Sequence, residues 1–462
     1  MEWPNAFHLL RAWLLAMQRK INMRRSYCDG ISRRQALRIG SVGLIGGLTL
    51  PRLLELEAVA GTGREAKAKS VIFLFLEGGP STIDMFDLKP EGPAEIRGPY
   101  QPIATKVPGT FVGEHCPLIA SIADKFTMVR SHSHKDNGHN TGYHYCMTGY
   151  KAAFADGQAG GVPNNLLFPS LGSIVSRELG PRGNIPVYVN LPDPMESGGP
   201  GFYGPAHAPF VLETDPVQPD FEVRDLRLAP GVSADRLERR RKMLAAVEQE
   251  NKARIAGRPN VMNTYYEKAY NMITAPDARK AFDIAAESDK TRERYGLTSL
   301  GQCALLARRL VEAGSRFVGV DNGSWDTHFS QFPSLKEDLI PSADRAFSAL
   351  VTDLDERGLL DSTLVIMMGE MGRTPQINTR AGRDHWSMTQ TILWAGGGVK
   401  QGQVIGATDK SCMYPTTEPY GVEDVICTIF HQMGIDTGKT YYTPLGRPVP
   451  IVNGGRVIPG LV

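Results

Sequence analysis

Two short segments of the chain place an acidic residue and a histidine close together. The first is Asp326-Thr327-His328, and the second is the adjacent pair Asp384-His385. Carboxylates and imidazoles are the side chains that hard and borderline divalent metal ions take as ligands. An ion held in this way can polarise an ester oxygen and lower the pKa of a hydroxyl or a water. The two segments therefore predict a metal site with hydrolytic chemistry.

Three further carboxylates stand at the ends of apolar runs. Glu77 follows SVIFLFL, Asp321 follows RFVGV, and Glu370 follows STLVIMMG. In open parallel sheets, ligands bind beyond the carboxyl ends of the strands. A single acidic strand end could be a helix cap or a surface group, but three of them beside two Asp/His segments favour a metal site. We expect one cleft to hold Glu77, Asp321, Asp326, His328, Glu370, Asp384 and His385.

Residues 131–144 form a segment that is rich in histidine and hydroxyl groups. It contains four of the nine histidines that follow residue 60. It offers hydroxyl nucleophiles, metal ligands and a helix N-terminus that could bind an anion. The alternative is a polar loop with incidental histidines.

The elements that would position these residues alternate between strand and helix. Continuous apolar runs predict strands at 70–77, 126–131, 185–191, 316–321, 362–370 and 389–395. Amphipathic patterns predict helices at 299–313 and 341–357, each followed by a glycine. Such alternation predicts an α/β fold with a mostly parallel sheet and helices on both faces. Residues 192–298 interrupt the pattern and are expected to form an irregular and helical insertion.

Composition and charge narrow the class of protein. The chain has 462 residues and a formal net charge of +2. Residues 1–60 hold 9 basic and 4 acidic residues, so the other 402 carry 42 basic and 45 acidic groups. This balance excludes a nucleic-acid binder held by bulk charge. Six cysteines without a CxxC pair argue against a disulfide framework or a zinc ribbon.

The first 60 residues are typical of an export signal. Arg33-Arg34 precede a short glycine-containing apolar run, and Ala58-Val59-Ala60 matches a cleavage site. The paired arginines indicate the twin-arginine type, with Met23 as a second candidate start. An amphipathic N-terminal helix of a cytoplasmic protein is the alternative. We expect residues 61–462 to be the mature domain, periplasmic or extracellular, without a stable membrane span because the apolar run is too short.

The chain as a whole resembles the alkaline phosphatase superfamily, which includes sulfatases, phosphomutases and nucleotide phosphodiesterases. More closely, it resembles an exported, sulfatase-like family of unknown function with a twin-arginine signal. The resemblance implies an alkaline-phosphatase-like three-layer α/β/α sandwich. The matching stretches cover nearly the whole mature chain: FLFLEGGPSTIDMFDLKP, HNTGYHYCMTGY, LLARRLVEAGSRFV, GSWDTH, GEMGRTP, GRDHW and AGGGVKQGQVIGATD.

The resemblance also implies roles for individual residues. Glu77 takes the place of the superfamily's first-strand metal Asp, and Glu370 that of the Asp in its late Asp-His pair. Asp326 and His328 match the middle ligands, and His385 matches the last histidine ligand. The nucleophile falls in the His139–Thr141 loop, where Thr141 is the only hydroxyl. Arg373 would either neutralise charge on the substrate or form a salt bridge that positions Glu370.

Besides the two positions where Glu replaces the superfamily's Asp, the sequence departs from the resemblance in two ways. Met371 stands where the second metal's histidine belongs, so that site is incomplete unless His132, His134 or His139 replaces it. The Cys/Ser-x-Pro-x-Arg signature of formylglycine sulfatases does not occur in the sequence. The implied activity is a metal-dependent hydrolase of phosphate or sulfate esters, using one or two divalent ions (Zn, Ca, Mg or Mn) on a small anionic or saccharide ester. The competing hypothesis is a catalytically degenerate exported protein that binds an anionic saccharide or a partner.

Overall fold

The computed structural model describes residues 66–154, 161–212, 214–223, 226, 232–252, 270 and 272–462. The chain divides into two units, Met1–Gly63 and Arg64–Val462. The predicted twin-arginine pair, the second start at Met23 and the cleavage site at 58–60 lie outside the described residues. The central sheet and the predicted site residues all belong to the second unit.

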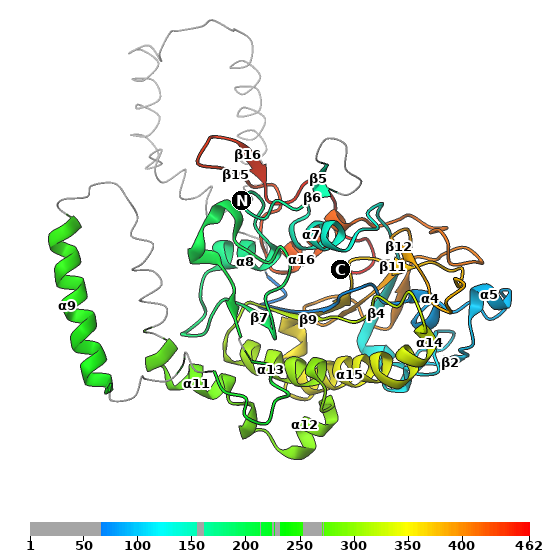
Figure 1. The fold of residues 1–462 in the computed structure, drawn as a ribbon, viewed down its shortest axis with the longest axis horizontal. Coiled ribbons are helices and arrows are strands. Elements are labelled where there is room, and N and C mark those ends of the chain that lie inside the picture. The colour runs from blue at the N-terminus through cyan, green and yellow to red at the C-terminus, as the bar shows by residue number, and fades with distance from the viewer. Residues whose placement is uncertain are drawn as a thin grey trace, which may run out of the picture. The chain divides into compact units, whose positions relative to one another are not determined.

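A mostly parallel sheet of eight strands forms the centre of this unit, in the order β14-β4-β13-β10-β1-β9-β7-β8 (Figure 1). Strand β13 runs antiparallel to both of its neighbours, β10 and β4, and the other pairs are parallel. The strands are β1 Ser70–Leu76, β4 Phe126–His132, β7 Tyr188–Leu191, β8 Phe210–Val211, β9 Phe317–Asn322, β10 Thr363–Met368, β13 Gln390–Ala395 and β14 Gln403–Ile405.

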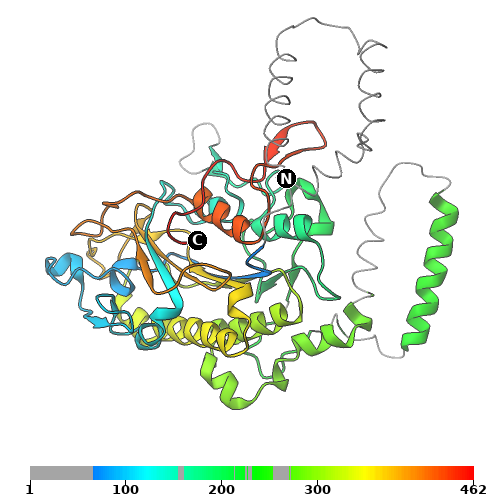
Figure 2. The same ribbon diagram turned by 180° about the vertical axis from the view of Figure 1, so that it is seen from behind.

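Helices cover both faces of the sheet, and β1 shows why. All seven of its residues are buried. Ile72, Leu74 and Leu76 belong to one hydrophobic cluster, whereas Val71, Phe73 and Phe75 belong to another, as period-two alternation requires. The first cluster includes α6 Pro117–Ser121, α13 Ser299–Ala313 and α15 Ile340–Glu356, and the second includes α7 His139–Thr148, α8 Leu171–Leu179 and α16 Val422–Gln432. Figures 1 and 2 show these two helical layers on opposite sides of the sheet. The predicted α/β fold is confirmed.

The direction of β13 determines which residues reach the site. Strands β1, β9, β10 and β4 all end at one edge of the sheet, because they are mutually parallel. Since β13 runs the other way, it begins at that edge. The residues just before β13, including Asp384 and His385, therefore lie beside the residues that follow the other strands.

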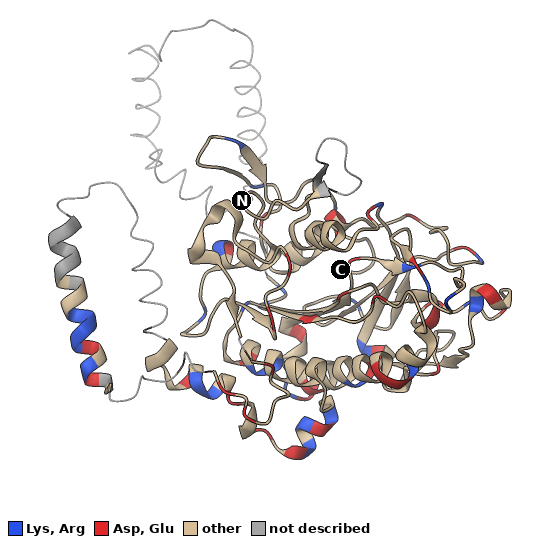
Figure 3. Cartoon of the chain, in the orientation of Figure 1, with Lys and Arg blue, Asp and Glu red and all other residues tan. Residues whose placement is uncertain are grey.

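Shorter elements surround the sheet. Residues 192–298, expected as an insertion, contain β8 and the helices α9 Ala234–Lys252, α11 Pro276–Phe282 and α12 Asp289–Tyr295. Charged residues crowd α9, and most of its described side chains in the run 236–242 are exposed (Figure 3). Around the sheet lie α4 Thr82–Met85, α5 Ala94–Arg97, α14 Gln331–Ser334, a π-helical turn at Leu335–Leu339, and the two-stranded pairs β2 Pro102–Ala104 with β3 Phe111–Gly113, β5 Ala153–Phe154 with β6 Gly161–Val162, β11 Gly372–Arg373 with β12 His385–Trp386, and β15 Thr440–Tyr442 with β16 Pro448–Pro450. Within the described ranges, no helix combines the length and apolar character needed to span a bilayer.

Candidate metal centre

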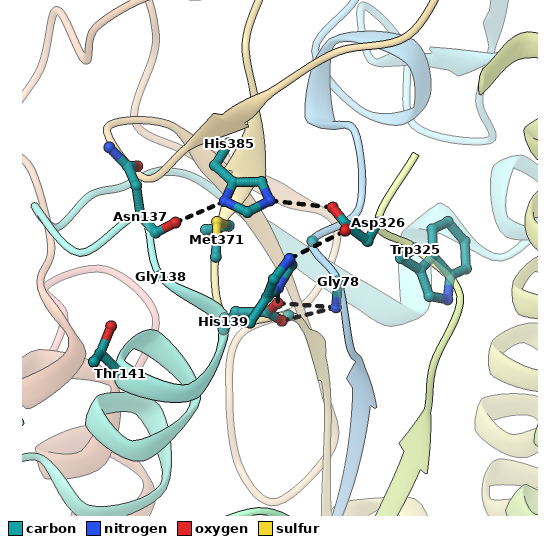
Figure 4. Close-up of polar contacts among 12 residues, drawn as sticks. Gly78, Asn137, Gly138, His139, Thr141, Trp325, Asp326, Met371 and His385 are labelled. Atoms are coloured by element: carbon teal, nitrogen blue, oxygen red, sulfur yellow. Dashed lines mark hydrogen bonds and ion pairs between the residues drawn. The ribbon is translucent and has the colours of Figure 1, made fainter. Parts of the chain in front are cut away.

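Four side chains from three parts of the chain converge at the strand ends. Figure 4 shows three of them, His139, Asp326 and His385. His139 is the first residue of α7, Asp326 and His328 lie in the loop after β9, and His385 begins β12. One ligand atom from each lies within 4.8 Å of the others. Asp326 Oδ1 is 3.0 Å from His328 Nε2 and 3.1 Å from His385 Nε2, while Asp326 Oδ2 is 3.3 Å from His139 Nε2. Asp326 is thus the carboxylate around which the three imidazoles gather.

Each imidazole forms a hydrogen bond through its Nδ1 atom, on the side of the ring that faces away from the cluster. His328 Nδ1 lies 2.6 Å from Asp384 Oδ1, His139 Nδ1 lies 2.7 Å from Glu370 Oε1, and His385 Nδ1 lies 2.7 Å from the carbonyl oxygen of Asn137. The three partner atoms are two carboxylate oxygens and a carbonyl oxygen, which accept hydrogen bonds, so each Nδ1 carries the proton and donates it. The three Nε2 atoms are then left with lone pairs that face the centre of the cluster. Metal-binding histidines are oriented by outer partners in this same way.

The contacts within the cluster are also those expected of a cation site. His139 Nε2 is shielded from solvent and has no hydrogen-bond partner within the part of the chain that the structure describes. His328 Nε2 and His385 Nε2 are 2.9 Å apart, a distance at which two lone pairs repel each other unless a proton or a cation lies between them. Three imidazole nitrogens and one carboxylate are a donor set suited to Zn²⁺ or a similar borderline divalent ion.

Glu370 contacts this cluster from outside. Its side chain is fully buried, and both carboxylate oxygens accept from the backbone N–H of Gly78, at 2.9 and 3.1 Å. The hydrogen bond that Glu370 accepts raises the pKa of His139, against the opposing effect of burial. Glu370 and Glu77, both predicted as ligands, lie at the same edge of the sheet, since Gly78 directly follows Glu77.

Arg373 contacts the loop that carries Asp326. This buried guanidinium donates to the carbonyl oxygens of Gly78, Gly79 and Trp325 and to Asp326 Oδ1, which lies 2.5 Å from Nη2. Burial opposes ionisation of Asp326, but the hydrogen bond and charge of Arg373, together with His385 and His139, lower the pKa of Asp326 to about 2. Arg373 was expected either to neutralise substrate charge or to form a salt bridge with Glu370. The structure has a salt bridge to Asp326 instead of Glu370, and the role toward a substrate stays a prediction.

Glu77 and Asp321 form an acidic group beside the cluster. Asp321 Oδ2 accepts from the hydroxyl of Tyr143 at 2.9 Å. Burial, and then the charge of Glu77, raise the pKa of Asp321 to about 7. Burial and the charges of Glu370 and Glu196 raise the pKa of Glu77. These predicted ligands therefore lie near the cluster but are not among the four groups that converge.

Thr141, predicted as the nucleophile, is turned away from the cluster. The predicted loop His139–Thr141 is the first turn of α7, and residues two apart on a helix do not face the same side. The Thr141 hydroxyl donates to Asp136 Oδ1 at 2.6 Å, and Figure 4 shows it pointing away from His139 and Asp326. His139 occupies the place in the site where the sequence suggested Thr141.

His132 and His134 lie behind the site. Both are buried, and burial lowers the pKa of His132 to about 3 and that of His134 to about 4. His132 donates to the carbonyl oxygen of Tyr420, and His134 to that of Glu370 at 2.7 Å. Of the three histidines proposed to replace the one missing at Met371, only His139 belongs to the cluster.

Sequence reasoning missed the outer partners that are not themselves ligands. Asn137 contributes its carbonyl oxygen to His385, and Asn378 Nδ2 donates to Asp384 Oδ1 at 3.2 Å. A backbone carbonyl leaves no trace in residue type, so the first contact could not have been found. The position of Asn378, six residues before Asp384, is a weak indication of their contact.

An α/β sheet with a His₃Asp cluster at its strand ends defines a candidate metalloprotein. The chain belongs to a family described as "Protein of unknown function (DUF1501)", which matches residues 68–462. No curated protein matches it.

Several solved structures share part of the fold. A PsFucS1 sulfatase from Pseudoalteromonas sp. is 14% identical with a TM-score of 0.36, over 83% of this chain and 70% of that one. The phosphonate monoester hydrolase SpPMH from Silicibacter pomeroyi is 12% identical with a TM-score of 0.36, over 80% and 74%. An alkaline phosphatase from the Antarctic bacterium TAB5 is 11% identical with a TM-score of 0.31, over 75% and 96%. Similarity at this level does not assign an activity to the chain.

Proposed function

We propose that the protein is a metal-dependent hydrolase of phosphate or sulfate esters that uses one divalent ion. His139, Asp326, His328 and His385 would hold the ion. The observation that carries the proposal is the shared orientation of the imidazoles, each fixed through Nδ1 with its Nε2 directed at Asp326. The second ion that the superfamily resemblance implied has less support, because Glu370 is already engaged by His139 and Gly78.

The ion would supply a Lewis acid that polarises the ester and acidifies a water. The residues of the chain hold and orient it: Asp384, Glu370 and Asn137 fix the three imidazoles, and Arg373 fixes Asp326. We infer that water, and not Thr141, attacks the ester, because the Thr141 hydroxyl is directed to Asp136. Tyr143 is likewise committed to Asp321.

A binding protein without turnover is the second candidate. It is favoured by Arg373, whose guanidinium donors go to main-chain oxygens and Asp326 instead of facing the position of a substrate anion. Its ligand would be an anionic saccharide or a partner protein. For either function, the double arginine and the small-residue site near 58–60 support export to the periplasm or beyond.

The two candidates are separated by metal analysis combined with an ester screen. We expect the purified full chain to bind one equivalent of Zn²⁺ or a similar ion and to hydrolyse an aryl phosphate or aryl sulfate. His328→Ala or His385→Ala should weaken binding by more than the roughly 10–100-fold loss that follows removal of an outer partner, because each removes a ligand itself.

Thr141→Val is the control for these variants. It keeps the shape of a residue beside the cluster and removes only a hydroxyl that points elsewhere, so it should retain both the ion and turnover. Full metal content in both histidine variants would refute the site. Loss of turnover in Thr141→Val with the ion still bound would restore Thr141 as the nucleophile. Stoichiometric metal without turnover on any ester would favour the binding protein.

A further inference from the structure

Two of the proposed ligand loops are joined by a buried polar network that contains no ligand. One loop carries Asp326 and His328, with Thr327 between them. The other loop carries His385 and begins at Gly382. The network consists of five side chains that are at least nine-tenths buried: Ser81, Asp84, Thr327, Gln331 and Arg383.

Asp84, on α4, is the centre of this network. Its carboxylate accepts Arg383 Nε at 2.8 Å and Arg383 Nη2 at 2.9 Å, a two-pronged pair in which both side chains are fully buried. Such planar pairing fixes direction as well as distance. Asp84 Oδ2 also accepts from Ser81 Oγ at 2.5 Å and from Gln331 Nε2 at 2.7 Å. The charge of Asp84 is therefore compensated from three sides.

The network reaches both ligand loops. Gln331 Oε1 accepts from the hydroxyl of Thr327 at 2.9 Å, which ties the first loop to Asp84. Arg383 ties the second loop to the same carboxylate, and its own backbone N–H donates to the carbonyl oxygen of Thr327 at 3.2 Å. The loops also touch directly, since a Cβ at Gly382 would lie 2.2 Å from the carbonyl carbon and oxygen of His328. Figure 1 shows α4 beside β11 and β12, close to these loops.

We propose that Asp84 and Arg383 act as positioning residues that set the distance between His328 and His385. The proposal rests on the proposed metal site. A buried charge pair is weak evidence for stability, because desolvation offsets much of its attraction. Its geometric effect is specific here, since one carboxylate connects two loops that each supply an imidazole. The two Nε2 atoms are 2.9 Å apart. Because the network ties both loops to one carboxylate, it would restrain any change in this distance when an ion binds.

The test compares two buried arginines. Arg383→Lys retains the charge but loses the two-pronged contact. Arg308→Lys is the matched control, because Arg308 is also buried and pairs with Asp353 at 3.0 Å and Glu287 at 2.7 Å, away from the ligand loops. Zn²⁺ affinity of the full chain would be measured by competition with a chelator, together with the visible spectrum of the Co²⁺ form and the thermal midpoint of the metal-free form.

We expect Arg383→Lys to bind Zn²⁺ about 10-fold to 100-fold more weakly, the range typical of outer partners of a metal site, and to alter the Co²⁺ spectrum. Arg308→Lys should lower the thermal midpoint but leave both metal measurements close to those of the wild type. Equal Zn²⁺ affinity in Arg383→Lys and the wild type would overturn the proposal while leaving the metal site intact.

A second, milder variant keeps the proposal testable if Arg383→Lys does not fold. Thr327→Val removes only the hydroxyl contact to Gln331, and it should weaken Zn²⁺ binding in the same direction by a smaller factor. If Arg383→Lys does not fold, unchanged Zn²⁺ affinity in Thr327→Val overturns the proposal. A wild-type chain that binds no divalent ion would refute the proposed function, and the positioning role with it.

Discussion

The carboxylate of Glu370 lies where an isolated negative charge would be costly. Moving an ionised carboxylate out of water costs several kcal/mol unless hydrogen bonds or charges compensate it. The backbone N–H of Gly78 and the imidazole of His139 provide that compensation. Glu370 resembles a metal ligand by its place after a strand, but its contacts are those of an outer partner that holds the proton on His139 Nδ1.

Replacing Glu370 by Gln distinguishes a ligand from an outer partner. We expect Glu370→Gln to weaken Zn²⁺ binding by about 10-fold to 100-fold, because His139 loses a charged acceptor but keeps its place. Chelator competition on the full chain gives the measurement. Asp344→Asn is the control: Asp344 is also buried and accepts backbone N–H groups, from Leu118 at 3.0 Å and Ile119 at 2.7 Å, and it should leave Zn²⁺ affinity unchanged. A loss as large as that of His328→Ala would show that Glu370 is a ligand after all.

Elements could be located from the sequence, but the direction of one strand could not. The helix predicted at 299–313 is observed with the same bounds, and the buried run after residue 69 is β1. QTILWA is buried along its whole length, so its pattern is the same whichever way the strand runs. Only its pairing with β10 and β4 shows that it is antiparallel and that His385 precedes it at the site edge.

The site was predictable to a similar extent. Asp326, His328 and His385 stand out by residue type and spacing alone. The start of α7 could not be located in the same way, because the sequence of this segment indicates no clear first residue for the helix. The helix begins at His139 and not after Thr141. Helix positions two apart point to different sides, so His139 faces the cluster and Thr141 does not. Backbone partners such as the Asn137 carbonyl depend on tertiary contacts that no local pattern encodes.

Close packing of α8 on β7 gives a test at the level of elements. A Cβ at Gly172 of α8 would lie 2.4 Å from ring atoms of Tyr188 on β7. Alanine normally stabilises a helix relative to glycine by about 0.5–1 kcal/mol. We expect Gly172→Ala to lower the free energy of unfolding by about 1–3 kcal/mol instead, because overpacking against a buried ring outweighs the helix preference. Denaturant unfolding of the metal-free chain measures the change.

Gly142 of α7 provides the matched glycine for this test. A Cβ there would meet its nearest neighbour, Glu370 Cβ, at 3.5 Å, which is an ordinary contact. Gly142→Ala should therefore be neutral or slightly stabilising. Equal effects of the two substitutions would mean that Tyr188 can move aside and that α8 is not held closely to β7.

At the scale of the whole molecule, the cysteines are relevant to the compartment in which the chain folds. All five described cysteines are free and buried, and burial raises the pKa of the Cys116, Cys146 and Cys303 thiols. Buried neutral thiols react slowly, whereas an unfolded chain would expose them in an oxidising compartment. If the chain is exported, as we propose, folding in the reducing cytoplasm before export would avoid that exposure. The twin-arginine signal that we propose agrees with this order of events, because that route carries folded proteins.

Export is tested by conservative changes in the arginine pair. We expect Arg33→Lys combined with Arg34→Lys to retain the precursor in the cytoplasm, because the route depends on both guanidinium groups and not on charge alone. Cell fractionation and immunoblotting give the measurement, and Arg38→Lys, outside the pair, is the control that should still be exported. The retained precursor should resist protease and bind Zn²⁺ as tightly as the mature chain, because the proposed route requires the fold and the site to be complete before transport. Unchanged export of the double variant would contradict the twin-arginine assignment. A retained but protease-sensitive precursor would instead show that folding follows transport.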